Sequence, residues 1–151
     1  RFCERFRGET PLYLLDILPQ DLRVNNTLLI DGIPQKVLAF TPNENEVDFK
    51  NNEYFKIFFE HWKYKTSYET YSDEQVDIVK INEELLLKIG AIKLDFKDFP
   101  SFNLLGTQIN FINDLWIDYA TRVEIKGLHH LQNIFYFRNS EELNVTCLTD
   151  R

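Results

Sequence analysis

The residues best suited to chemistry are two adjacent histidines, His129 and His130, in the stretch KGLHHLQNIFYFRNSEELNV near the end of the sequence. An imidazole can act as a general base at neutral pH or coordinate a metal ion. On a helix, however, neighbouring side chains point about 100° apart. The two rings therefore cannot hold one metal ion together, as a pair spaced four residues apart could.

Catalysis by His129 would require a positioned nucleophile, or an acid such as Asp118 or Glu124, in the same cleft. No motif identifies such a partner, and the HExxH, GxGxxG, Walker A, GxSxG and SxxK patterns are absent from the sequence. We therefore predict no catalytic residue, no metal site and no cofactor, and we interpret both histidines as part of the packing. A small enzyme that uses His129 is kept as an alternative.

The middle of the chain suggests a different kind of site, because it is both acidic and rich in aromatic residues. Eleven acids and five bases between residues 44 and 84 give a charge of −6, out of −7 for the whole chain. Eight of the 22 aromatic residues lie between residues 54 and 71. Tyr and Trp contribute much of the binding energy at protein interfaces, whereas acidic charge opposes contact with nucleic-acid phosphates.

We therefore predict a surface that binds a host or effector protein with a basic surface, without direct contact to nucleic acid. The same rings could instead form the core of a sheet, and the charge could serve only solubility. The predicted contact residues are Glu44, Glu46, Asp48, Glu53, Tyr54, Trp62, Tyr64, Tyr68, Tyr71, Asp73 and Glu74.

The two cysteines, Cys3 and Cys147, stand near opposite ends of the sequence and match no metal-binding or CxxC spacing. Such a count indicates free thiols in a reducing compartment, although a disulfide would be possible if the two ends met. No run of 18 apolar residues and no signal-peptide pattern is present. We expect a cytoplasmic protein that does not enter a membrane.

The elements that must position these residues form an α+β chain. We predict a helical extension over residues 1–18 and a single α+β domain over residues 19–151. Within that domain, residues 19–50 form a small antiparallel, SH3-like β meander. Its strands are residues 27–30, 35–41 and 46–50, with a tight turn at Asp31-Gly32. Residues 53–72 fit either a helix or strands, and we favour strands with a turn near residues 65–67.

Residues 77–148 are predicted as a core of helix, sheet and helix, in which the sheet is mixed or antiparallel. Asn82 caps the first helix and Gly90 ends it. The strands that follow are residues 92–96, 107–112, 115–119 and 122–125, with a turn at Asn113-Asp114.

The last helix begins after Gly127, packs on the sheet and ends at Asn139-Ser140, and LNVTCL supplies a final strand. Helical spacing divides this helix into two sides. The predicted buried side holds Leu128, Leu131, Ile134 or Phe135, and Phe137. The predicted opposite side holds His129, Gln132, Asn133 and Tyr136.

Three segments stand out by their order and spacing: LPQDLRVNNTLLIDGIPQKV, VDIVKINEELLLKIGAIKL and VEIKGLHHLQNIFYFRNSEELNV. Across residues 17–145 they resemble a family of small proteins from Bacteroidetes genomes and their phages. Members carry an LRIGN-like opening strand, a PLTEEWLxKxGF-like helix and a VHxLQNLYFxLTGEEL-like closing segment. The chain departs from these motifs at residues 25–26, 81–82 and 138–139. The closing motif aligns without a gap with His129, Leu131, Gln132, Asn133, Phe135, Glu142 and Leu143.

The resemblance implies no catalytic residues, because the family has no assigned enzymatic activity. It also implies a gene carried by phages, prophages or other mobile elements. We therefore expect a non-enzymatic accessory protein that binds a host protein in the cytoplasm of the host bacterium. Inhibition of an antiphage defence nuclease, in the manner of an anti-CRISPR protein, is the form of this hypothesis that the negative charge favours. A virion-associated or self-assembling structural protein is the alternative, and a homo-oligomer is possible.

Overall fold

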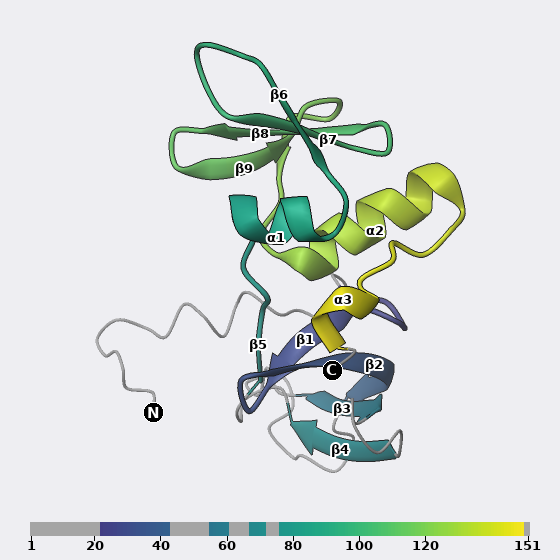
Figure 1. Ribbon diagram of the computed structural model, residues 1–151. Helices are drawn as coiled ribbons and strands as arrows, with labels where there is room; N and C mark the ends of the chain where they lie inside the picture. Colours follow the sequence, from purple (N-terminus) through teal and green to yellow (C-terminus); the bar gives the residue numbers. More distant parts are fainter. Residues whose placement is uncertain (1–21, 43–54, 61–66, 72–75, 150–151) are drawn as a thin grey trace. The chain divides into compact units, whose positions relative to one another are not determined.

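The computed structural model describes residues 22–42, 55–60, 67–71 and 76–149 (Figure 1). The chain divides into two compact units, Arg1–Val79 and Lys80–Arg151. Among the described residues, each unit contains a five-stranded antiparallel sheet, and the second also contains three helices. The predicted α+β class is therefore confirmed. The single domain over residues 19–151 stays a prediction, and the predicted extension at residues 1–18 and strand at residues 46–50 lie outside the described residues.

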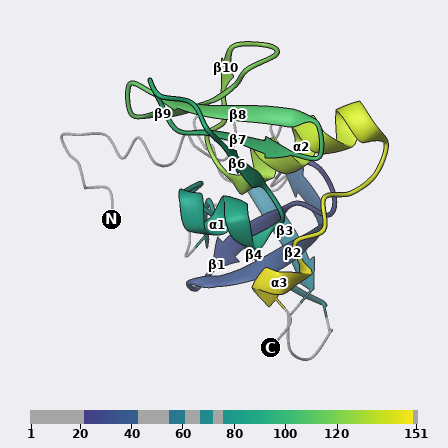
Figure 2. The same cartoon turned by 45° about the horizontal axis from the view of Figure 1, so that its top comes forward.

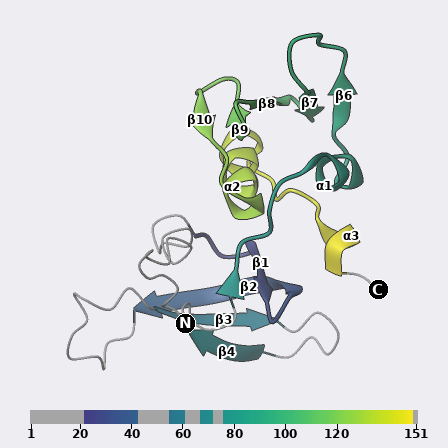
Figure 3. The same cartoon turned by 90° about the vertical axis from the view of Figure 1, so that its left-hand side faces the viewer.

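The sheet of the first unit is an antiparallel meander of four strands, with a fifth strand returning beside the first. Figure 3 shows β1 to β4 side by side. The predicted strands at residues 27–30 and 35–41 and the turn between them are confirmed, and residues 55–60 and 67–71 form strands as we favoured. In sheet order the strands are β4 (Ser67–Tyr71), β3 (Phe55–Glu60), β2 (Ile33–Pro42), β1 (Thr27–Ile30) and β5 (Val76–Asp77).

The core of the first unit is built from aliphatic side chains on neighbouring strands. Leu28 on β1, Val37 on β2 and Ile57 on β3 are fully buried, and Leu22 and Ile78 pack with them. Burying a side chain of this size stabilises the folded state by about 1.5–3 kcal/mol. These contacts hold the meander in its register.

The second unit contains a sheet whose strands follow one another in chain order, and Figure 2 shows β8, β7 and β6 beside one another. The strands are β6 (Ile92–Leu94), β7 (Ser101–Leu104), β8 (Thr107–Ile112), β9 (Leu115–Asp118) and β10 (Val123–Glu124). The helices are α1 (Glu83–Lys88), α2 (Leu128–Asn139) and α3 (Thr146–Thr149). Four of the five strands were predicted, and β7 was missed.

Helix α1 begins and ends as its sequence predicts. The Oδ1 atom of Asn82 accepts a hydrogen bond from the backbone N–H of Leu85 at 2.7 Å. Gly90 follows the helix with a φ of +106°, a left-handed conformation that costs glycine little. Leu85 and Leu86 are buried, as expected for the core-facing side.

The predicted final strand is wrong, because residues Thr146–Thr149 form the short helix α3. The side chain of Asn144 explains the difference. Its Oδ1 atom accepts hydrogen bonds from the backbone N–H of Thr146 at 3.0 Å and from the hydroxyl of Thr146 at 2.8 Å. Such a bond starts a helical turn in a segment whose β-branched residues favour a strand.

The two sides of α2 differ from the prediction. Leu128, Leu131 and Phe135 are buried as expected, but Phe137 is 89% exposed. Phe137 stands nine positions after Leu128, which places it about 180° around the helix from that buried residue. His129 and Gln132 were placed on the opposite side, and instead they are buried. The buried arc of α2 is therefore wider than the apolar positions alone indicate.

Candidate functional site: a pocket on the open face of the second sheet

The predicted partner-binding residues fall on parts of the chain that give no side-chain geometry. Tyr68 and Tyr71 belong to β4, of which the backbone alone is described, and β4 is the terminal strand of its sheet. The other nine lie outside the described residues: Glu44, Glu46, Asp48, Glu53, Tyr54, Trp62, Tyr64, Asp73 and Glu74.

His129 is held in a fully buried position within the second unit. Neither of its ring nitrogens has a hydrogen-bond partner in the described part of the chain, and its ring centroid lies 4.7 Å from that of His130. Burial lowers the pKa of His129 to about 3, with smaller contributions from the positive charges of His130 and Lys126. The imidazole is therefore neutral at pH 7, which suits packing and does not suit proton exchange with a substrate.

The two acids considered beside His129 have other surroundings. Asp118 is fully buried and its carboxylate is bound by Arg138 and Thr121, while Glu124 is exposed on β10. Over residues 22–42, 55–60, 67–71 and 76–149, no group of three or more His, Cys, Asp or Glu side chains could hold a metal ion.

The two faces of the second sheet have different characters. The register places Phe102, Ile109 and Asp118 on one face, and this face carries fully buried side chains. Helices α1 and α2 lie on one side of this sheet in both Figure 1 and Figure 3. The hydrogen bond that Arg138 of α2 donates to Asp118 identifies the covered face. Because side chains alternate along a strand, Ser101, Asn110 and Ile117 lie on the other face. Neither α1 nor α2 covers that face, and we refer to it as the open face.

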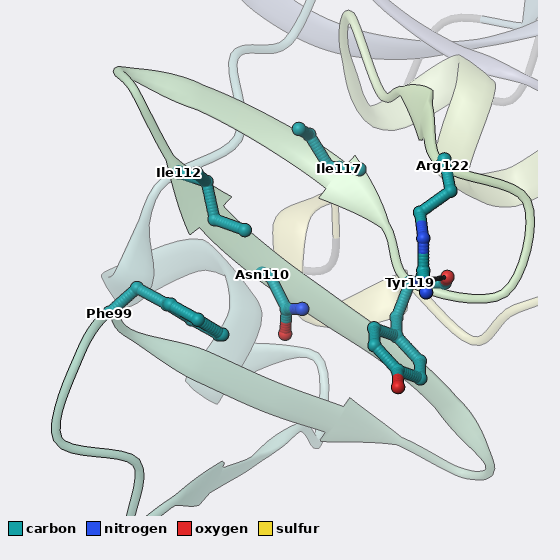
Figure 4. Close-up of a pocket in the computed structure, with 6 residues that line it drawn as sticks. All are labelled: Phe99, Asn110, Ile112, Ile117, Tyr119 and Arg122. Atoms are coloured by element: carbon teal, nitrogen blue, oxygen red, sulfur yellow. Dashed lines mark hydrogen bonds between the residues drawn. The ribbon is translucent and has the colours of Figure 1, made fainter.

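The open face contains a pocket with a volume of about 190 Å³ (Figure 4). Pockets that bind cofactors or drug-sized ligands measure about 300–1,000 Å³, so this one fits a single large side chain better. Phe99 lies at one side in Figure 4 and Tyr119 at the other, with Asn110 between them. The lining residues are Phe99, Asn110, Ile112, Ile117, Tyr119 and Arg122.

Asn110, the buried polar residue of the lining, belongs to a hydrogen-bonded trio with Ser101 on β7 and Gln108 on β8. The hydroxyl of Ser101 donates to Oδ1 of Asn110 at 2.6 Å, and Nε2 of Gln108 donates to both of these oxygens at 3.2 Å. These bonds satisfy the polar groups of Ser101 and Asn110, which are buried on the face opposite to helices α1 and α2. Both contacts of Asn110 use its oxygen, and the described residues provide no acceptor for its amide nitrogen, which faces the Tyr119 side in Figure 4.

The turn after β9 forms one wall of the pocket, and Asp118 fixes it from the covered face. Its Oδ2 atom accepts hydrogen bonds from the hydroxyl of Thr121 at 2.6 Å and from the backbone N–H of Thr121 at 3.2 Å. Its carbonyl accepts from the backbone N–H of Arg122 at 2.8 Å. Arg138 of α2 donates to Oδ1 of the same carboxylate at 2.8 Å. Thus α2 holds Asp118, and Asp118 shapes the turn that carries Tyr119 and Arg122.

The pKa of Asp118 is lowered from its ordinary value. Burial alone would raise this pKa, but the hydrogen bonds from Arg138 and Thr121 and the charge of Arg138 together outweigh it. The carboxylate is therefore ionised at neutral pH, as its structural role requires.

Arg122 places a positive charge on the rim of the pocket. Its guanidinium carbon lies 4.3 Å from the centroid of the Tyr119 ring, and one of its nitrogens donates to the carbonyl of Tyr119. In the described part of the chain its guanidinium pairs with no carboxylate. The remaining N–H groups of Arg122 are available to an incoming anion.

The sequence prediction missed this site, although one signal for it was present. Gln108, Asn110 and Ile112 alternate along β8 and so share a face, and asparagine is uncommon inside a strand. A polar residue there indicates a hydrogen-bonded network or a binding site. The part played by Phe99 and Arg122 depends on loops whose course no local pattern defines.

Comparison of the chain with protein-family models, with curated proteins and with solved structures finds no match. The resemblance to the Bacteroidetes and phage family therefore stays a prediction. None of the described helices is long and apolar enough to cross a membrane.

Proposed function

We propose that this chain is a non-enzymatic protein-binding module whose partner docks on the open face of the sheet β6–β10. The observation that carries this proposal is the pocket for one side chain within that face. Interfaces commonly depend on a few anchor side chains that enter such pockets, surrounded by contacts that exclude water.

The surroundings of the pocket support the same proposal. Leu115, Tyr119 and Ile92 lie on or beside the open face and are each more than two-fifths exposed. Tyr119 supplies a rigid, amphipathic ring, a type of side chain enriched at interfaces. A partner that covers these residues would remove apolar surface from water, which favours association.

We further propose that the partner is a host protein with a basic surface and that binding inhibits it, as an anti-CRISPR protein inhibits a defence nuclease. The charge of −6 over residues 44–84 and the resemblance to phage-encoded proteins support this part. Strand β4, with Tyr68 and Tyr71, is a terminal strand of its sheet, and such strands can pair with a strand of another chain.

Affinity capture from the native host, followed by mass spectrometry, tests the docking face. We expect a partner retained by the unaltered chain to be lost with Tyr119→Ala, because a wall of the pocket is removed. Phe137→Ala is the matched control, since Phe137 is an exposed aromatic residue on α2, away from the open face. Equal capture by the two variants, both folded by circular dichroism, would contradict the assignment of this face.

A further inference from the structure

We propose that the pocket binds the C-terminal end of a partner protein, with a large apolar last side chain in the cavity and the terminal carboxylate on Arg122 and Asn110. This inference rests on the proposed function and adds the chemistry of the group that is bound. It follows from the volume, the lining and the polar groups of the pocket.

The cavity selects an apolar group of limited size. Phe99, Ile112, Ile117 and Tyr119 form most of its lining, and about 190 Å³ leaves room for one large side chain. The ring of Phe99 also contacts that of Phe96, whose centroid lies 5.7 Å away in an edge-to-face arrangement. Each wall therefore presents an aromatic ring, Phe99 in contact with Phe96 and Tyr119 in contact with the Arg122 guanidinium.

The polar groups at the pocket select an anion. Arg122 offers N–H donors that have no carboxylate partner among the described residues, and Asn110 offers an amide nitrogen whose own oxygen is already bonded to Ser101 and Gln108. Both groups donate hydrogen bonds and carry positive or partial positive charge. A carboxylate accepts such bonds in a charge-assisted way, which makes them stronger than bonds between neutral groups.

A chain terminus combines the two requirements in one residue. The α-carboxylate of a last residue is attached to the same carbon as its side chain, so an anion lies beside the apolar group without any further length of chain. Capture of a C-terminal carboxylate is a known mode of peptide recognition, in which specificity comes from the pocket for the last side chain. A terminus also needs only one path of entry between the Phe99 loop and the Tyr119–Arg122 turn, which flank the pocket in Figure 4.

The test uses acetylated five-residue peptides that end in Leu or Phe, titrated into the full chain and followed by ¹⁵N–¹H NMR. We expect the side-chain amide signals of Asn110 and the guanidinium signals of Arg122 to shift with the free-acid peptides. Amidation of the peptide end, or replacement of its last residue by Ala, should weaken binding about tenfold or more, because a charged hydrogen bond or the buried side chain is lost.

One variant isolates the contribution of the carboxylate, and a second serves as its control. Arg122→Gln should weaken binding of the free-acid peptide about tenfold and leave binding of the amidated peptide unchanged. Lys126→Gln removes an exposed positive charge outside the pocket and should change neither, which makes it the matched control.

Several outcomes would overturn the inference. Equal affinity for free-acid and amidated peptides would show that the terminal carboxylate is not recognised. Stronger binding of an amidated peptide with an internal apolar-acidic pair would show that the pocket binds an internal segment and not a chain end. Concentration-dependent shifts of the same signals without peptide would point to a second copy of the chain. If no peptide shifts Asn110 or Arg122 while Tyr119→Ala still abolishes capture of a partner, the inference fails and the proposed function stands.

Discussion

At the scale of single residues, His129 shows how an imidazole can be used for packing. It lies at a fully buried position, carries no hydrogen bond from the described residues to its ring nitrogens, and has a pKa of about 3. Burying a polar group without a hydrogen-bond partner costs about 1–3 kcal/mol of folding free energy. Protonation would add the larger cost of a buried charge, so the folded state holds the imidazole in its neutral form.

The first prediction concerns the pH dependence that His129 confers. The unfolded chain takes up a proton near pH 6.5, whereas the folded chain resists protonation until about pH 3, so the free energy of unfolding falls as the pH drops below 6.5. The slope approaches about 1.4 kcal/mol per pH unit for this residue. Urea unfolding at pH 7 and pH 5 should show that His129→Leu removes about 2 kcal/mol of the loss seen in the unaltered chain.

His130→Gln is the control for this measurement, because His130 is only half-buried and its Nδ1 atom accepts a hydrogen bond from the backbone N–H of Lys126. An equal loss of stability on acidification in the unaltered chain and in His129→Leu would show that His129 is accessible to protons in the folded state.

The second prediction concerns Leu105, which has a φ of +49° and is 70% exposed at the tip of the β7–β8 hairpin. The left-handed region is unfavourable for leucine, whereas asparagine adopts it readily in turns of this kind. Leu105→Asn should raise the free energy of unfolding by up to about 1 kcal/mol. Thermal denaturation measures the change, and Leu115→Asn, at an exposed position with ordinary backbone, should give no increase.

At the scale of elements, the second sheet is joined to α2 by the pair of Asp118 and Arg138. Arg138 binds the carboxylate through two nitrogens, an arrangement that fixes both distance and orientation. Because Asp118 also holds the following turn, this contact connects the covered face of the sheet with the wall of the pocket.

The third prediction is that Arg138→Met lowers the free energy of unfolding by about 3–5 kcal/mol, since it leaves a buried carboxylate without its charged partner. Urea denaturation measures the loss. Asp118→Asn combined with Arg138→Met should recover part of the loss, because no buried charge remains. A loss below about 1 kcal/mol in the single variant would show that water satisfies the carboxylate instead.

The elements also show how far local sequence patterns predict this fold. Helix α1 was predicted because Asn82 and Gly90 act within one turn of the backbone. Two hairpin turns were predicted from the left-handed preferences of Asp31-Gly32 and Asn113-Asp114, whereas the turn at Leu105-Gly106 was missed. Strand β7 alternates polar and apolar residues, but it has only four residues, too few to distinguish a strand from a loop, so pairing with β6 and β8 decides its conformation. Burial of His129 and Gln132 is likewise a tertiary effect, which polarity along a helix cannot indicate.

The same limit applies to the candidate site. A polar Asn110 within a strand was readable from the sequence, but its bond to Ser101 requires the register of β7 against β8. The approach of Phe99 and Arg122 requires two loops from different parts of the sheet. The predicted contact residues of the middle region were chosen by composition, and composition carries no information about which side chains lie together.

At the scale of the whole molecule, the chain divides into two compact units with separate sheets. The proposed docking face belongs to the second unit, and the predicted acidic and aromatic surface belongs largely to the first. A partner that contacts both would gain affinity from the link between them, because the second contact is intramolecular once the first has formed.

The fourth prediction separates these two contributions. Changing Glu44, Glu46, Asp48 and Glu53 to Lys should slow association with a basic partner about tenfold or more at low salt, since steering depends on charge. Surface plasmon resonance at two salt concentrations measures the rate. Tyr119→Ala should instead speed dissociation and leave association little changed. Unaltered association after the four charge reversals would remove the electrostatic part of the proposal.

The position of Asp118 between α2 and the pocket wall has a thermodynamic corollary. Any occupant that favours the present conformation of the Tyr119–Arg122 turn must, by reciprocity, stabilise the contact of Asp118 with Arg138 at the end of α2 to the same degree. Slower amide hydrogen exchange in the last turn of that helix would then report an event on the opposite side of the sheet, where the occupant itself makes no contact.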